Sequence, residues 1–231
     1  VSMISATEGW AVGPYTILHY TDNNWQELSG AMEVAGELRN VDMISPEEGW
    51  SIGMGGPKSP KILHYHEGIW ENDPMTDGSF LLTNLKMISS TDGWAVGGPG
   101  IILHYTNGSW IRVTSPTDKT LWGISMLSSN DGWIVGDGGT ILHYTDNQWT
   151  LVPSPVQTDL SSVYMLSAAD GWAVGANTIL HYNAGKWSTV PVPASVGLTA
   201  ITMVSSNEGW AVDGDGAILH YYNGVWSIDS R

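Results

Sequence analysis

Hydrophobic and polar residues alternate along this chain in short runs that end at Gly, Asn, Asp, Ser or Pro. The runs are rich in β-branched and aromatic side chains, which is typical of β-strands. Apolar residues do not recur at helical spacing, and Gly and Pro interrupt the chain too often for long helices. The pattern therefore predicts an all-β protein made of many short strands.

The same pattern occurs six times, and four positions recur in every copy. They are a Met, a Trp that follows Gly, a His that precedes Tyr, and a second Trp. These four columns are Met3, Met43, Met87, Met126, Met165 and Met203; Trp10, Trp50, Trp94, Trp133, Trp172 and Trp210; His19, His64, His104, His143, His181 and His220; and Trp25, Trp70, Trp110, Trp149, Trp187 and Trp226. Such self-similarity indicates a repeat architecture.

The spacing between the columns is fixed at two connections and free at two others. Met and the first Trp are 7 residues apart in all six copies, and His and the second Trp are 6 apart. The first Trp and His are 9 to 14 residues apart, and the second Trp and the next Met 16 to 18. The string ILHY followed by Asn107-Gly108 predicts a two-residue hairpin.

Each copy therefore has room for four short strands, which is the size of a propeller blade and more than a β-helix rung. We predict an all-β, six-bladed β-propeller of four-stranded antiparallel blades, forming a single domain over residues 1-231. The predicted repeats span approximately residues 1-29, 30-74, 75-114, 115-153, 154-191 and 192-231. Copy one lacks the apolar residues that begin the first strand of the other copies, so its first strand is expected to be short unless further residues precede it.

The strings GWAVG and ILHY, followed by a polar turn and Trp, resemble the β-propellers of the photosystem II assembly-factor family and their Asp-box relatives, the sortilin- and sialidase-like proteins. The resemblance covers all six copies and implies a propeller fold. The polar turns, such as Thr21-Asp22-Asn23-Asn24-Trp25, are shorter than an Asp-box. We therefore transfer the fold and not the function.

Charge and composition exclude several classes of partner. The 231 residues include 23 acids and 8 bases, giving a net charge of −15, which repels nucleic acid and anionic lipid. No apolar run approaches the roughly 18 residues of a membrane helix, so we expect no membrane insertion. Cys is absent, which removes disulfides and thiol chemistry. The remaining partner classes are a protein or a glycan.

The repeated side chains are expected to build the blades. A buried polar network recurs as a unit because each member must be satisfied, so each His is predicted to bond a polar residue of its own copy. The candidates are Ser5 or Glu8 in copy one and Ser89 or Asp92 in copy three, as in WD-repeat propellers, which this pattern resembles. The acid before Gly-Trp is expected to accept backbone N–H bonds in its turn.

The two Trp columns are expected to pack between blades, because each indole buries a large apolar area. An alternative leaves the second column partly exposed, as a set of platforms on which sugars stack. That alternative makes the protein a multivalent glycan-binding lectin.

Motifs for catalysis are missing from the sequence. It has no P-loop, nucleophile elbow or HExxH, and its three Arg are not placed for a carboxylate clamp. His64-Tyr65-His66 places two imidazoles on one strand face, but His66 is better read as a turn residue. Asp213-Gly214-Asp215-Gly216 is better read as a hairpin turn than as part of a calcium loop. We expect no enzyme, no cofactor and no metal site.

Recognition is predicted at the residues that break the repeat. Consecutive turns of an up-and-down blade alternate between its two ends, so both variable connections share one end, where loop length is free of packing constraint. The candidate binding residues near these connections and on the first strands are Arg39, Asn40, Asp42, Lys58, Lys61, Asn84, Lys86, Trp122, Tyr164, Asp213 and Asp215.

The sequence thus predicts a non-enzymatic binding or scaffold propeller that recognises a protein or glycan through its variable loops. The absence of Cys, the few Lys and the many Ser, Thr, Asn and Trp favour a secreted or cell-surface protein, of bacterial type. The alternatives are the multivalent lectin and an assembly or chaperone factor like the photosystem II family.

Overall fold

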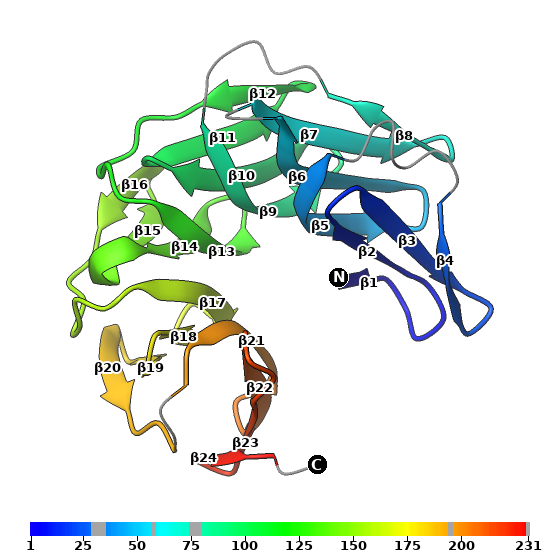
Figure 1. The fold of residues 1–231 in the computed structure, drawn as a ribbon. Coiled ribbons are helices and arrows are strands. Elements are labelled where there is room, and N and C mark those ends of the chain that lie inside the picture. The colour runs from blue at the N-terminus through cyan, green and yellow to red at the C-terminus, as the bar shows by residue number, and fades with distance from the viewer. Residues whose placement is uncertain (29–35, 57–58, 74–79, 194–195, 230–231) are drawn as a thin grey trace. The chain divides into compact units, whose positions relative to one another are not determined.

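The computed structural model describes residues 1–28, 36–56, 59–73, 80–193 and 196–229, and β-strands joined by turns make up nearly all of them (Figure 1). The strands form six four-stranded antiparallel sheets with their strands in chain order. This confirms the predicted six-bladed β-propeller fold. By packing, the chain divides into two compact units, Val1–Asp118 with blades 1 to 3 and Lys119–Arg231 with blades 4 to 6.

The first unit contains twelve strands. They are β1 (Ser2–Met3), β2 (Gly9–Gly13), β3 (Thr16–Thr21) and β4 (Asn24–Glu27) in blade 1; β5 (Glu37–Ser45), β6 (Glu48–Gly56), β7 (Ser59–His66) and β8 (Ile69–Asn72) in blade 2; and β9 (Leu81–Ser89), β10 (Asp92–Gly98), β11 (Ile101–Thr106) and β12 (Ser109–Arg112) in blade 3. As expected from the missing apolar residues, β1 is short.

The second unit also contains twelve strands, and a short 3₁₀ turn, η1 (Asp137–Gly139). The strands are β13 (Leu121–Ser128), β14 (Asp131–Gly136), β15 (Ile141–Thr145) and β16 (Gln148–Leu151) in blade 4; β17 (Leu160–Ser167), β18 (Asp170–Gly175), β19 (Thr178–Asn183) and β20 (Lys186–Val190) in blade 5; and β21 (Leu198–Ser205), β22 (Glu208–Asp213), β23 (Ile218–Tyr222) and β24 (Val225–Ile228) in blade 6.

The fixed turn lengths have local causes. Between the first and second strands of every blade, a Ser hydroxyl accepts a bond from the backbone N–H two residues later, at 3.1–3.2 Å. This Ser-based turn sets the seven-residue spacing. In the hairpin between β11 and β12, Asn107 and Gly108 have φ of 51° and 74°, as the predicted two-residue turn requires.

The Met column packs against the Gly that precedes the first Trp. Met43 and Gly49 face each other across β5 and β6. A Cβ built on Gly49 would lie 2.2 Å from the Met43 Sδ, and the same contact recurs in all six blades at 2.2–2.3 Å. The dipeptide Gly-Trp therefore recurs because the Met side chain occupies the space of a Cβ.

Trp, His and an acid form one cluster in each blade. Trp and His are cross-strand partners, as at Trp133 and His143, and their rings stack at 3.9–4.7 Å. The His Nε2 lies 2.5–2.9 Å from the acid before Gly-Trp in five blades and 3.6 Å in the sixth. Of the candidates predicted to bond His, Glu8 in blade 1 and Asp92 in blade 3 are therefore the residues that do so.

The structure corrects two details of this prediction. Ser5 and Ser89 bond the Thr two residues later instead of His, because the turn holds each hydroxyl near that residue. The carboxylate of the acid before Gly-Trp pairs with the His side chain, where the prediction had placed backbone amides, because the His strand runs beside the turn.

Neighbouring blades meet through the same aromatic side chains. Trp133 of blade 4 stacks on its own His143 and contacts Tyr182 and Trp187 of blade 5, with ring centroids at 4.7 and 5.5 Å. Trp10 and Trp172 repeat this arrangement. The two Trp columns therefore build the interfaces between blades, as predicted.

Candidate functional site

The first strands of neighbouring blades lie against each other within each unit, and we call them the inner strands: β5 beside β9, and β17 between β13 and β21. The residue before the column Met links them in blades 1, 2 and 4. Ser2 Oγ accepts a bond from the Met43 N–H at 3.0 Å, and Ser125 Oγ from the Met165 N–H at 3.1 Å. This position therefore stabilises the contact between blades, a role that the sequence did not reveal.

At the interface of blades 2 and 3, Asp42 takes the place of that Ser. Its Oδ2 accepts a bond from the Met87 N–H at 2.7 Å, and both carboxylate oxygens lie 3.0 Å from Lys86 Nζ. The Asp42 side chain is 14% exposed and that of Lys86 43%. The Asp42 side chain is therefore largely enclosed, while the Lys86 side chain is partly exposed.

Two amides join the same pair of strands closer to the variable connections. Asn40 Nδ2 donates to Asn84 Oδ1 at 3.2 Å. We refer to Asn40, Asp42, Asn84 and Lys86 as the inner-strand cluster. The structure thus brings four of the predicted binding residues together, from two strands more than 40 residues apart in sequence.

Three more predicted residues belong to blade 2. Arg39 is exposed on β5, next to the inner-strand cluster in sequence. Lys61 is half-buried on β7, and burial lowers the pKa of its ammonium group below the usual value. Lys58 lies outside the described residues.

The predicted binding residues of the second unit do not form one cluster, and two of them hydrogen-bond a loop of their own blade. Trp122 Nε1 donates to Asp137 Oδ1 at 2.5 Å, which ties β13 to η1. Asp213 Oδ1 accepts bonds from the N–H groups of Asp215 and Ala217 at 2.9 and 2.7 Å, the hairpin-turn role expected for this sequence. Asp215 is exposed, and Tyr164 is half-buried against the core of blades 5 and 6.

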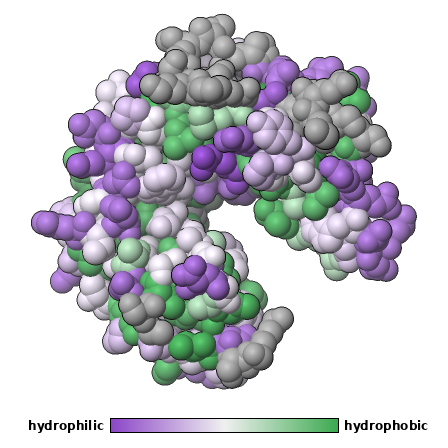
Figure 2. Space-filling model, in the orientation of Figure 1, coloured by the Kyte–Doolittle hydropathy of each residue, from purple (hydrophilic) through white to green (hydrophobic). Residues whose placement is uncertain are grey.

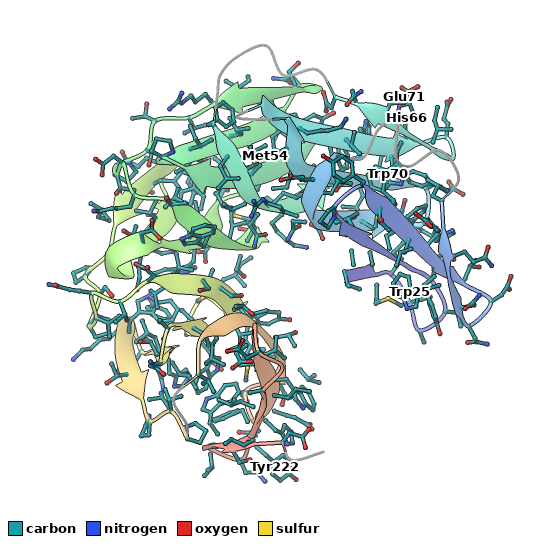
Figure 3. The ribbon with its side chains drawn as sticks, in the orientation of Figure 1. Trp25, Met54, His66, Trp70, Glu71 and Tyr222 are labelled. Carbon is teal, nitrogen blue, oxygen red and sulfur yellow. The ribbon has the colours of Figure 1, made fainter. Side chains whose placement is uncertain are left out.

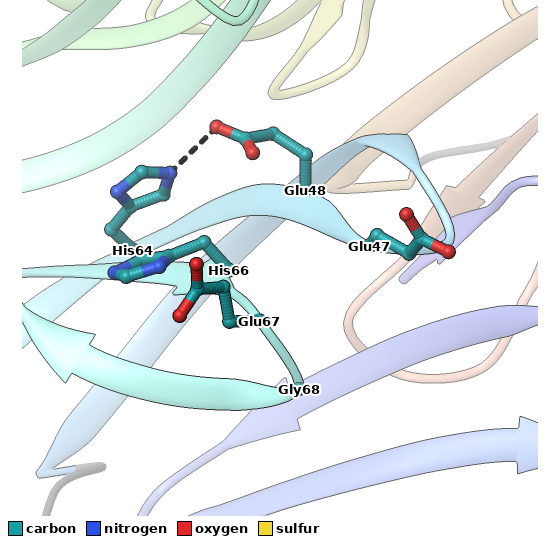
Figure 4. Close-up of a pocket in the computed structure, with 6 residues that line it drawn as sticks. All are labelled: Glu47, Glu48, His64, His66, Glu67 and Gly68. Carbon is teal, nitrogen blue, oxygen red and sulfur yellow. Dashed lines mark hydrogen bonds and ion pairs between the residues drawn. The ribbon is translucent and has the colours of Figure 1, made fainter.

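A cleft of about 660 Å³ opens at the fixed turns of blade 2, where the sequence predicted no site (Figure 4). It is lined by Glu47, Glu48, His64, His66, Glu67 and Gly68. A smaller cleft of about 420 Å³ occupies the matching place in blade 4, lined by Asn130, Asp131, Thr145, Asp146 and Asn147. The hollow thus recurs in two blades with an acid at two matching positions, and Glu47 and His66 are particular to blade 2.

Each His of the blade 2 cleft has a carboxylate partner. His64 Nε2 lies 2.8 Å from Glu48 Oε1, and His66 Nε2 lies 3.4 Å from Glu71 Oε2 (Figures 3 and 4). Among the residues that the structure describes, no three His, Cys, Asp or Glu side chains are grouped so as to hold a metal ion. A residue-by-residue comparison of the six hairpins would have singled out His66, because Thr, Asn or Tyr stands there in the other copies.

The second Trp column does not form a set of exposed platforms. Trp70, Trp149, Trp187 and Trp226 are 3–5% exposed, because each packs against a neighbouring blade or within its own. Trp110 is half-buried against the core of blades 2 and 3, and Trp25 is exposed at 38% (Figure 3). On the face drawn in Figure 2, hydrophilic and hydrophobic side chains are mixed in both units.

No family model matches the sequence, and no curated protein matches it either. Solved structures do match. YCF48 bound to D1 peptide aligns with a TM-score of 0.77 and 20% identity, over 99% of this chain and 79% of that one. YCF48 from Cyanidioschyzon merolae aligns with 0.74 and 18%, over 96% and 78%.

An enzyme shares the fold as well. A catalytically inactive virginiamycin B lyase from Staphylococcus aureus with quinupristin aligns with a TM-score of 0.79 and 17% identity, over 95% of this chain and 78% of that one. At such identities the likeness shows the propeller fold alone, and a fold that hosts both binding proteins and an enzyme does not decide the activity. Within the described residues the structure has no helix that is long and apolar enough to cross a membrane.

Proposed function

We propose that this chain is a non-enzymatic binding or scaffold propeller that recognises a protein segment at the inner-strand cluster of blades 2 and 3. The observation that carries the proposal is Asp42. Ser2 and Ser125 make the same bond to the next blade with a neutral hydroxyl, so the fold does not require a charge there. Enclosing a carboxylate costs free energy, which the bonds from Lys86 and Met87 offset.

The chemistry of the cluster suits a peptide. The ammonium group of Lys86 and the amides of Asn40 and Asn84 offer donors and acceptors side by side, as a peptide main chain does. Arg39, the residue before Asn40 in the sequence, is exposed. The neighbour YCF48 with its D1 peptide supports a peptide partner by analogy of fold, which also keeps the assembly-factor alternative open.

Selection from a library of displayed random 12-residue peptides, followed by calorimetry with one selected peptide, tests the proposal. The double variant Asp42→Ser/Lys86→Ser copies the residue of blades 1 and 4 and keeps a hydroxyl for the Met87 N–H. We expect it to weaken binding at least about tenfold, the loss of a charge-assisted contact. Asp146→Asn, an exposed change in blade 4, is the matched control and is expected to bind normally.

Either of two results would overturn the proposal: a library that yields no binder, or a selected peptide that binds the double variant as tightly as the native protein. A location outside the cell or at its surface is part of the same proposal and rests on composition.

For the lectin alternative, the structure has one exposed indole of the second Trp column, that of Trp25. A glycan array with the native protein and with Trp25→Ala tests this alternative.

A further inference from the structure

A carboxylate occupies an apolar position in the interface between blades 2 and 3. Three residues after the second Trp, the six copies carry Leu28, Asp73, Val113, Val152, Val190 and Asp229. Leu28, Asp73 and Val152 have the same backbone setting, each donating its N–H to an Ile carbonyl of the third strand at 2.9–3.0 Å. These are therefore equivalent places in the fold.

The apolar members of this set show what the position normally does. Leu28 packs against the cluster that holds Trp10 and Trp70, and Val152 against the cluster with Trp133 and Trp187. In each case the apolar side chain packs against a cluster that contains indoles of two adjacent blades. Asp73 lies near the indole N–H groups of Trp50 and Trp110, which belong to blades 2 and 3.

Asp73 is half-buried, and burial raises the pKa of its carboxyl above the usual range. The nearby His64 and, less strongly, the indole N–H groups of Trp110 and Trp50 lower that pKa, but by less than burial raises it. The other titratable groups near Asp73 are Tyr105 of blade 3, whose pKa is raised by burial and then by the Asp73 and Glu48 charges, and Glu48, which is paired with His64.

The aromatic packing differs at this interface. The centroids of Trp50 and Tyr105 are 5.3 Å apart, whereas the equivalent pairs Trp10–Tyr65, Trp133–Tyr182 and Trp172–Tyr221 are 4.6–4.7 Å apart. We propose that the interface between blades 2 and 3 is a pH-responsive joint, which is weakened when Asp73 is ionised and tightened when Asp73 is protonated. This inference goes beyond the proposed function, and its test uses no binding partner.

The direction of the effect follows from linkage. A carboxyl whose pKa is higher in the folded than in the unfolded state binds its proton more tightly when folded. The folded state therefore gains stability as the pH falls through the folded pKa, until the unfolded value of about 3.9 is reached. Most paired carboxylates have a lowered pKa in the folded state, so they make the protein less stable as the pH falls. The contribution of Asp73 is therefore measured as the difference between the native protein and a variant that lacks this carboxyl.

The experiment measures the melting temperature of the native protein and of Asp73→Val between pH 7.5 and pH 4.5. At pH 7.5 we expect the variant, which copies Val152, to melt about 2–4 °C higher. The difference in melting temperature between the variant and the native protein is expected to shrink toward pH 4.5. Asp73→Asn, which keeps the shape without the charge, is expected to show the same narrowing gap.

Val152→Asp is the matched reverse variant and is expected to gain the pH dependence that Asp73→Val loses. A carbon NMR titration of the Asp73 carboxyl is expected to place its pKa above 3.8, whether or not the reverse variant folds. A gap that stays constant between the two pH values, an Asp73→Val protein that melts lower at pH 7.5, or a titration at or below 3.8 would each overturn the inference.

Discussion

At the scale of single residues, close backbone approaches decide which positions must be Gly. Gly136 ends β14, and a Cβ built on it would lie 2.2 Å from the Thr120 carbonyl oxygen. Its φ of −165° is extended backbone that any residue adopts, so only the space forbids a side chain. Gly13 holds the equivalent place in blade 1, where β1 is short and no described atom lies within 4 Å of such a Cβ.

We therefore expect Gly136→Ala to lower the free energy of unfolding by about 1–3 kcal/mol, the usual cost of overpacking. Gly13→Ala is expected to be neutral or to stabilise by up to about 1 kcal/mol, because the unfolded chain loses freedom. Urea unfolding of both variants measures the difference. Equal effects of the two substitutions would show that the approach to Thr120 does not constrain the strand.

At the scale of elements, one hydrogen bond between inner strands recurs with different chemistry. Ser2 and Ser125 accept the Met amide of the next blade with a hydroxyl, and Asp42 accepts it with a carboxylate. Removing the acceptor leaves the Met87 N–H without its partner between β5 and β9, whereas a hydroxyl restores the bond.

Asp42→Ala is thus expected to lower the free energy of unfolding by about 1–3 kcal/mol, the cost of an unsatisfied buried donor. Asp42→Ser is expected to lie within about 1 kcal/mol of the native protein, because it also loses the ion pair with the half-exposed Lys86. Denaturant titration checks both values. If alanine and serine destabilise equally, the bond to Met87 is not what joins these strands.

At the scale of the whole molecule, the repeat made the fold predictable, because six copies of one pattern average out local ambiguity. The repeated columns predicted the four strands of each blade and the packing of Trp between blades. The string ILHY followed by Asn107-Gly108 predicted the hairpin. The Ser-based turn and the Met–Gly contact were not predicted, because spacing shows that a turn is fixed and not which atoms fix it. The Asp42–Lys86 pair needed the register between blades, which no single copy contains.

The site was predictable only in part for a related reason. Residues that differ between copies can be found in the sequence, but their neighbours cannot. Asn40 and Asn84 were singled out separately and lie together, whereas Trp122 and Asp213 were singled out as binding residues and hold loops. His66 also breaks the repeat, at a fixed turn, and Asp73 does so directly after β8, where a variable connection begins.

The charge of the whole molecule gives a further prediction. With 23 acids against 8 bases, repulsion within the folded state is screened by salt. Raising sodium chloride from about 10 mM to about 500 mM at pH 7.5 is expected to raise the melting temperature by several degrees, since the Debye length falls from about 30 Å to a few Å. A melting temperature that falls with added chloride would mean that attractive pairs outweigh the repulsion.

We propose that side chains common to all six blades build the fold, and that the residues that differ between blades recognise the partner. A crystal structure of the protein with a peptide selected from the displayed library tests this most directly. We expect the peptide to contact Asn40, Lys86 or Asn84 on β5 and β9. A peptide held by the Met, His or Trp columns, or seated only at the fixed turns, would contradict it.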